Sequence, residues 1–118
     1  MARSALTKLR AICAAIPDYR EGDHFGKLAL KSGDRMFATY REDGDDCEIV
    51  FGLEPAHARE LLASDSRFTA YPRVANTLVI RGSDLDDWNE LRSLIEESYR
   101  LSLLQKKRRP RKRSVKRR

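Results

Sequence analysis

Apolar side chains recur every three or four positions in two segments of the N-terminal half, and this spacing predicts two helices. The first covers residues 4–15, and Pro17 lies where this helix should stop. The second covers residues 54–65, with Pro55 at its first helical position, where the missing N–H costs no hydrogen bond. Each helix has one apolar stripe, so each should pack one face against a core.

A third and longer helix is predicted from residue 83 toward the C-terminus. Ser83 and Asp86 resemble a capping box at its start. Pro110 lacks a backbone donor and clashes with the preceding turn, so we expect the helix to end near Arg109.

Short stretches of alternating apolar and polar residues predict five strands. These strands are residues 27–31, 35–40, 47–52, 67–71 and 76–82. Residues 32–34 contain Gly33 and residues 41–46 contain an Asp-Gly pair, and both are typical of tight turns between antiparallel strands. Residues 17–26 are expected to form a loop.

The predicted order is one helix, three strands, a second helix, two strands and a third helix. Consecutive hairpins favour an antiparallel sheet, and single-striped helices favour its coverage from one side. The fold class is therefore α+β: a two-layer sandwich with an antiparallel sheet of about five strands and helices on one face. The other face is expected to be open to solvent.

Charge is distributed unevenly along the chain, whose formal net charge is +6 over 118 residues. Ten cations and no acid lie in residues 105–118, which leaves residues 1–104 with fourteen Lys and Arg against eighteen acids, a net charge of −4. The ten are Lys106, Lys107, Arg108, Arg109, Arg111, Lys112, Arg113, Lys116, Arg117 and Arg118. Runs of like charge repel themselves and often serve as interaction arms. We therefore expect a domain over residues 1–104 and a basic, disordered tail over residues 105–118.

Four stretches of the domain are similar to the MmcQ/YjbR family. They are GDHFGKLALKSGDRMFATY (22–40), DDCEIVFGLEPAHARELLA (45–63), NTLVIRG (76–82) and LIEESYRL (94–101). The resemblance implies an α+β fold similar to the frataxin-like CyaY architecture. It also implies DNA binding through two hairpin wings, which by position are the turns at 32–34 and 41–46.

The expected function is non-enzymatic binding of nucleic acid, with DNA expected ahead of RNA and no sequence preference. If about six tail cations meet phosphates, the logarithm of the binding constant should fall with the logarithm of salt concentration with a slope of about −5. The tail has no aromatic residue on which bases could stack. Lys31, Arg73 and Arg81 are candidate auxiliary phosphate contacts on the outer sheet face.

Three alternatives remain open from the sequence. The tail could be a solvated arm that aids solubility or binds acidic proteins. The outer sheet face could bind a partner protein or a small ligand. The acidic turn could hold a divalent cation through carboxylate oxygens. The acidic residues concerned are Glu42, Asp43, Asp45, Asp46 and Glu48.

Catalytic patterns and cofactor motifs are not expected. His24 and His57 are the two histidines, and neither stands in a nucleophile or metal-ligand motif. Cys13 and Cys47 lie on apolar faces and should be buried free thiols, which fits a reducing, cytoplasmic setting. The chain has no apolar run of the ~20 residues that a membrane helix needs.

Overall fold

The computed structural model describes the backbone of residues 2–116 and the side chains of residues 4–104. The helices are α1 (Ala2–Cys13), α2 (Pro55–Ser64) and α3 (Trp88–Lys116), with a short 3-10 turn, η1 (Gly82–Asp84). The strands are β1 (Tyr19–His24), β2 (Lys27–Ser32), β3 (Arg35–Asp43), β4 (Asp46–Gly52), β5 (Phe68–Ala70) and β6 (Thr77–Arg81).

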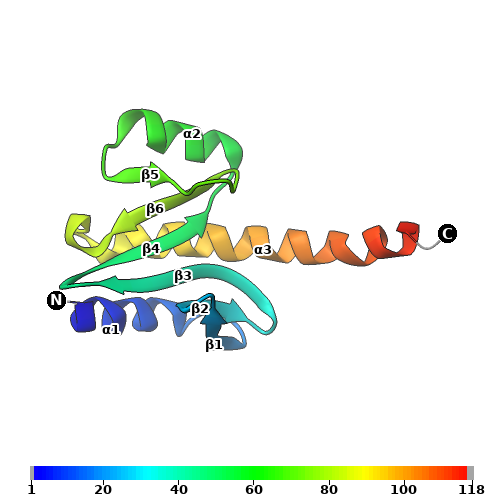
Figure 1. Ribbon diagram of the computed structural model, residues 1–118, viewed down its shortest axis with the longest axis horizontal. Coiled ribbons are helices and arrows are strands. Elements are labelled where there is room, and N and C mark those ends of the chain that lie inside the picture. Colours follow the sequence, from blue (N-terminus) through cyan, green and yellow to red (C-terminus); the bar gives the residue numbers. More distant parts are fainter. Residues whose placement is uncertain (1, 117–118) are drawn as a thin grey trace.

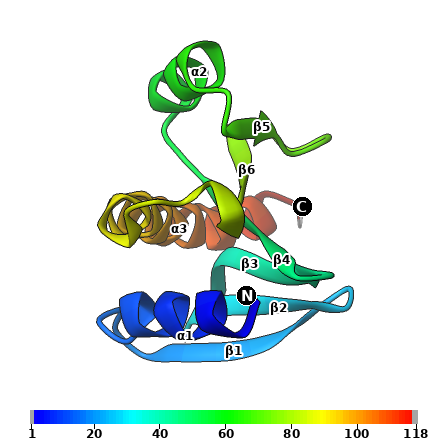
Figure 2. The ribbon, with the colours of Figure 1, turned by 90° about the vertical axis from the view of Figure 1, so that its left-hand side faces the viewer.

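All six strands form one antiparallel sheet in the order β1-β2-β3-β4-β6-β5 (Figure 1). Figure 2 shows the helices on one side of the strands. The main core lies between them and includes Leu9 of α1, Ala58 of α2 and Leu91 of α3 with the inner sheet residues Ile49 and Ile80. The predicted α+β class, with helices on one face, is confirmed. The likeness to CyaY stays a prediction.

Strand β1 lies where the sequence predicts a loop. Its sequence, YREGDH, does not alternate between apolar and polar residues. Tyr19 at its start packs against the core. Backbone pairing with β2 along its whole length makes it a strand. An edge strand pairs with only one neighbour and can leave most of its side chains in solvent. Its hydrophobic pattern is therefore weak and did not indicate a strand.

A β-bulge changes the direction of one aromatic side chain in β3. In a regular strand, neighbouring residues face opposite sides of the sheet, so Phe37 and Ala38 should lie on different faces. The β2–β3 register shifts between Leu30 and Lys31, however, and leaves Phe37 as the extra, unpaired residue of a bulge. Phe37 is therefore buried on the core side with Ala38. Its ring centroid lies 6.0 Å from that of Tyr99 on α3.

Both predicted ends of α3 were wrong. Ser83 forms no capping box and instead donates its hydroxyl to Asp46, while Asp87 accepts the Asn89 N–H at the true start of the helix. The backbone stays helical through Pro110 to Lys116. A proline inside a helix costs about 3 kcal/mol, but Lys and Arg, which flank it, are strong helix formers.

The outer sheet face is uncovered, as expected, but it curls, so its centre is less open to solvent than that of a flat sheet. Lys27 on β2 donates to the Tyr71 hydroxyl, just beyond β5, at 2.7 Å. In a flat sheet these strands would lie roughly 19 Å apart, four spacings of about 4.8 Å, so the sheet must curl strongly. Ala29, Thr39 and Val50, which alternate with core residues, are consequently buried on this face although no described helix covers it.

Over the residues that the structure describes, none of the helices combines the length and apolar character that a membrane span requires.

Candidate functional site

The basic tail continues α3 away from the sheet, toward the end marked C in Figure 1. Its predicted contacts are Lys106, Lys107, Arg108, Arg109, Arg111, Lys112, Arg113, Lys116, Arg117 and Arg118. The side chains of all ten lie outside the described residues. Their number and position along the chain come from the sequence, and the helical backbone to Lys116 comes from the structure.

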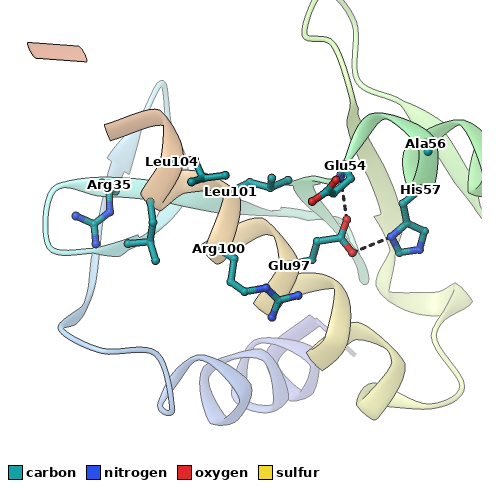
Figure 3. Close-up of a pocket in the computed structure, with 9 residues that line it drawn as sticks. Arg35, Glu54, Ala56, His57, Glu97, Arg100, Leu101 and Leu104 are labelled. Carbon is teal, nitrogen blue, oxygen red and sulfur yellow. Dashed lines mark hydrogen bonds and ion pairs between the residues drawn. The ribbon is translucent and has the colours of Figure 1, made fainter. Parts of the chain in front are cut away.

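An open groove of about 1090 Å³ lies at the base of the tail, between the last described turns of α3, the start of α2 and the start of β3 (Figure 3). Leu101 and Leu104 give it an apolar floor. Arg35 and Arg100 line it as cations, and neither makes a side-chain hydrogen bond or ion pair within residues 4–104. The Nε atom of Arg35 is buried without a partner in this described part. The groove therefore presents two guanidinium groups without acidic partners in residues 4–104, alongside the Glu54 and Glu97 carboxylates that also line it.

Sequence reasoning missed both groove arginines. Arg35 opens a strand and Arg100 lies on a helix 65 positions later, and no spacing rule links them. That the two arginines lie on the same groove becomes evident only in the fold, where the start of β3 lies beside α3. A search for exposed Arg residues near the tail boundary would have found Arg100 alone.

The other end of the groove is closed by a contact between α2 and α3. The Glu97 carboxylate accepts the Glu54 N–H at 2.8 Å and contacts Nδ1 of His57 at 2.8 Å (Figure 3). The first backbone donors of a helix have no partner inside it, so this carboxylate compensates for the missing bonds at the start of α2. His57 therefore has a structural role, because its contact with Glu97 links α2 to α3.

The acidic turn between β3 and β4 is partly neutralised by two arginines, Arg41 and Arg81. The Arg81 guanidinium contacts Asp43 at 2.9 Å, Asp46 at 3.0 Å and Glu48 at 3.2 Å. Asp46 also accepts hydrogen bonds from Ser83 through its N–H and hydroxyl. The Ser83 hydroxyl, and then the Cys47 N–H and Arg81, hold the pKa of Asp46 well below its usual range.

These contacts bear on two predictions. Arg81, a predicted phosphate contact, is held by three carboxylates, so a phosphate would have to compete with them. For the metal alternative, the described residues contain no group of three or more His, Cys, Asp or Glu side chains arranged to hold an ion.

The other two auxiliary residues lie apart from Arg81. Lys31 is on β2, opposite Arg20 of β1, and two strands separate β2 from β6. Arg73 lies exposed in the loop between β5 and β6, at a positive φ of 69°. The structure therefore does not gather Lys31, Arg73 and Arg81 into one patch, and their role in binding stays a prediction.

Both cysteines are buried free thiols, as predicted. Burial raises the pKa of the Cys13 thiol to about 12. A thiol with such a pKa is almost fully protonated at neutral pH and is a poor nucleophile.

A comparison with family models matches YjbR over residues 14–101, about three quarters of the chain. The chain belongs to the YjbR family. A search of curated proteins finds no match. The YjbR match begins at the end of α1 and stops within α3, so it includes all six strands and leaves the basic tail outside.

The YjbR resemblance predicts that the turns at 32–34 and 41–46 are DNA-binding wings, and this role stays a prediction. In the structure the two turns lie at opposite ends of β3. One turn joins β2 to β3 near Arg35, on the side of the groove. The other is the acidic turn, which contacts the chain just before α3 through the Asp46–Ser83 hydrogen bonds. The turn at 32–34 is therefore the nearer of the two to the tail.

Proposed function

We propose that this YjbR-family protein is a non-enzymatic nucleic-acid-binding protein, with DNA ahead of RNA, that holds phosphates mainly through its basic tail. The observation that carries the proposal is the run of ten cations without an acid in residues 105–118, which follows directly on a helix leading away from the domain. Phosphate contacts of this kind carry no sequence information, so binding should be sequence-neutral.

The length of the segment suits this role. A helix rises about 1.5 Å per residue, so residues 105–116 cover roughly 18 Å. Duplex DNA carries one charge per about 1.7 Å of its axis, so this length faces several phosphates. Each neutralised phosphate releases counterions, which is the source of affinity.

The acidic turn does not oppose this binding strongly. It lies beside the start of α3, and the helix runs roughly 24 Å from Trp88 to Leu104. Screening at physiological ionic strength acts over about 8 Å, so the carboxylates are some three screening lengths from the tail. The Arg81 ion pairs reduce their net charge further.

Arg35 and Arg100 support the same proposal from the domain side. They line the groove beside Leu104, the last described residue before the tail, and have no acidic partner within residues 4–104. They would extend the basic surface onto the domain. The buried thiols fit a reducing compartment, and we place the protein in the cytoplasm on this ground.

The proposal is tested by comparing the full chain with a chain that ends at Leu104, using fluorescence anisotropy on labelled duplex DNA. We expect the shorter chain to lose most of its affinity at moderate salt. A full-length variant with six tail cations changed to Gln should lose it as well, because charge and not length is required. Arg59→Gln, an exposed arginine on α2, serves as the control and should bind normally. Equal affinity of the full and shortened chains would rule the proposal out.

A further inference from the structure

The hairpin joining β1 to β2 ends in a two-residue turn, Phe25–Gly26, since His24 and Lys27 still pair. Both turn residues have positive φ, 54° for Phe25 and 85° for Gly26. Two positive φ angles define a type I′ turn, whose preferred sequence is Asn-Gly. Figure 2 shows this hairpin reaching out on the side away from the helices.

Phenylalanine is an unfavourable residue at the first position of this turn. A bulky side chain at positive φ is a conformational outlier, because Cβ crowds the backbone. The residue gains no burial in return, since Phe25 is 90% exposed, more than any other large hydrophobic residue in the described part of the chain. A residue that breaks a local rule without a packing gain points to a functional contact.

The groups around the Phe25 ring indicate what kind of partner it can contact. The His24 and Phe25 rings form a T-shaped pair, with the ring centroids 4.7 Å apart and the ring planes at 73° to each other. Lys27 turns away, because its ammonium group lies over the Tyr71 ring at 4.7 Å from the centroid. Asp23, two positions before the ring, would repel phosphate. The chemistry at this tip therefore suits an uncharged aromatic group and not a phosphate.

We propose that Phe25 is a stacking surface for an unpaired nucleobase of a single-stranded segment. This inference rests on the proposed function and deepens it. The basic tail contains no aromatic residue and can hold only the phosphates. Phe25 supplies the missing stacking contact, and together they favour single-stranded over fully paired nucleic acid.

The test compares Phe25→Asn with the unaltered full chain on a labelled oligo(dT) of about 16 nucleotides. Stacking of one base on an aromatic side chain corresponds to roughly 5- to 150-fold in affinity, so we expect a loss in this range. The loss should be absent on an abasic strand of the same length, which has the same phosphates. Phe25→Trp should bind oligo(dT) at least as well as the unaltered chain.

Two controls separate stacking from folding. Phe25→Asn creates the preferred Asn-Gly turn, so its thermal midpoint of unfolding should be unchanged or higher. Val74→Asn removes another exposed apolar side chain and should leave oligo(dT) binding unchanged. A lower thermal midpoint for Phe25→Asn would show that the ring supports the fold and would overturn the inference.

The outcomes also distinguish this inference from the proposed function. If Phe25→Asn binds oligo(dT) like the unaltered chain while removal of the tail abolishes binding, the stacking surface is refuted and the tail proposal stands. If Phe25→Asn weakens oligo(dT) and abasic strand equally, base stacking is likewise refuted. If the unaltered full chain binds no strand, both proposals fall.

Discussion

At the scale of single residues, a buried serine on α3 joins two strands of the sheet. The Ser98 hydroxyl donates to the Phe37 carbonyl and accepts the Gly52 N–H at 3.0 Å. The bulge at Phe37 interrupts the β2–β3 ladder, and Ser98 satisfies its carbonyl. This one side chain therefore fixes the position of α3 on β3 and β4.

Ser98→Ala should destabilise the fold by about 1–3 kcal/mol, because two buried backbone groups lose their partner. Ser102→Ala is the matched control, since Ser102 is also buried on α3 but donates only to the Tyr99 carbonyl of its own helix. Urea unfolding measures both free energies. Equal losses in the two variants would contradict the bridging role.

Asp46 should make stability depend on acid pH. Its pKa is lowered in the folded state, so its stabilising effect is complete above the unfolded-state pKa of 3.8 and is lost as the pH falls toward the folded-state pKa. Asp46→Asn should therefore lower the free energy of unfolding at neutral pH, and the difference from the unaltered chain should shrink below about pH 4.

The neighbouring Asp45→Asn is the control for this measurement, because Asp45 is exposed. Its free energy of unfolding at neutral pH should stay close to that of the unaltered chain. A difference between Asp46→Asn and the unaltered chain that stays constant from neutral pH to pH 3 would show that charge is not the cause.

At the scale of elements, the junction between β6 and α3 is packed too tightly for a side chain. A Cβ atom added to Gly82 in η1 would lie 2.6 Å from the Cys47 Sγ of β4. The contact holds η1 against the sheet and sets the direction in which the chain enters α3.

Gly82→Ala should therefore cost about 1–3 kcal/mol by overpacking. Gly52→Ala offers a matched comparison, because its Cβ would meet no atom closer than 3.9 Å. Thermal unfolding of both variants tests this, and a Gly82→Ala chain as stable as Gly52→Ala would contradict the tight junction.

The elements also show what the sequence could reveal. The apolar stripes of α1 and α2 predicted both helices to within about two residues, because burial of one face decides where a helix forms. Strand β1 was missed because pairing with β2, and not an apolar pattern, forms it. The face of Phe37 was missed because a bulge overrides alternation.

Of the candidate site, only the basic tail could be predicted from the sequence, because its charges are consecutive along the chain. The tail is visible as a run of residues. The placement of Arg35 and Arg100 along one groove requires the tertiary fold, and so do the ion pairs that hold Arg81. The exposure of Phe25 depends on β1, the strand that the sequence did not reveal.

At the scale of the whole molecule, charge is separated along the longest dimension of 52 Å. Figure 1 shows the β3–β4 turn, which carries the acidic cluster, at the left and the C-terminus at the right. The domain over residues 1–104 has a net charge of −4, and the tail carries ten positive charges. A polyanion should therefore approach the tail end first.

The most direct test of this account is the salt dependence of DNA binding by the full chain and by the chain that ends at Leu104. The account predicts that the logarithm of the association constant of the full chain falls with the logarithm of salt concentration with a slope of about −5 or steeper, if six or more phosphates are neutralised. The shortened chain should show a much shallower slope, about −2 if Arg35 and Arg100 are its remaining phosphate contacts. Affinity of the full chain that does not change with salt, or equal slopes for the two chains, would contradict the account.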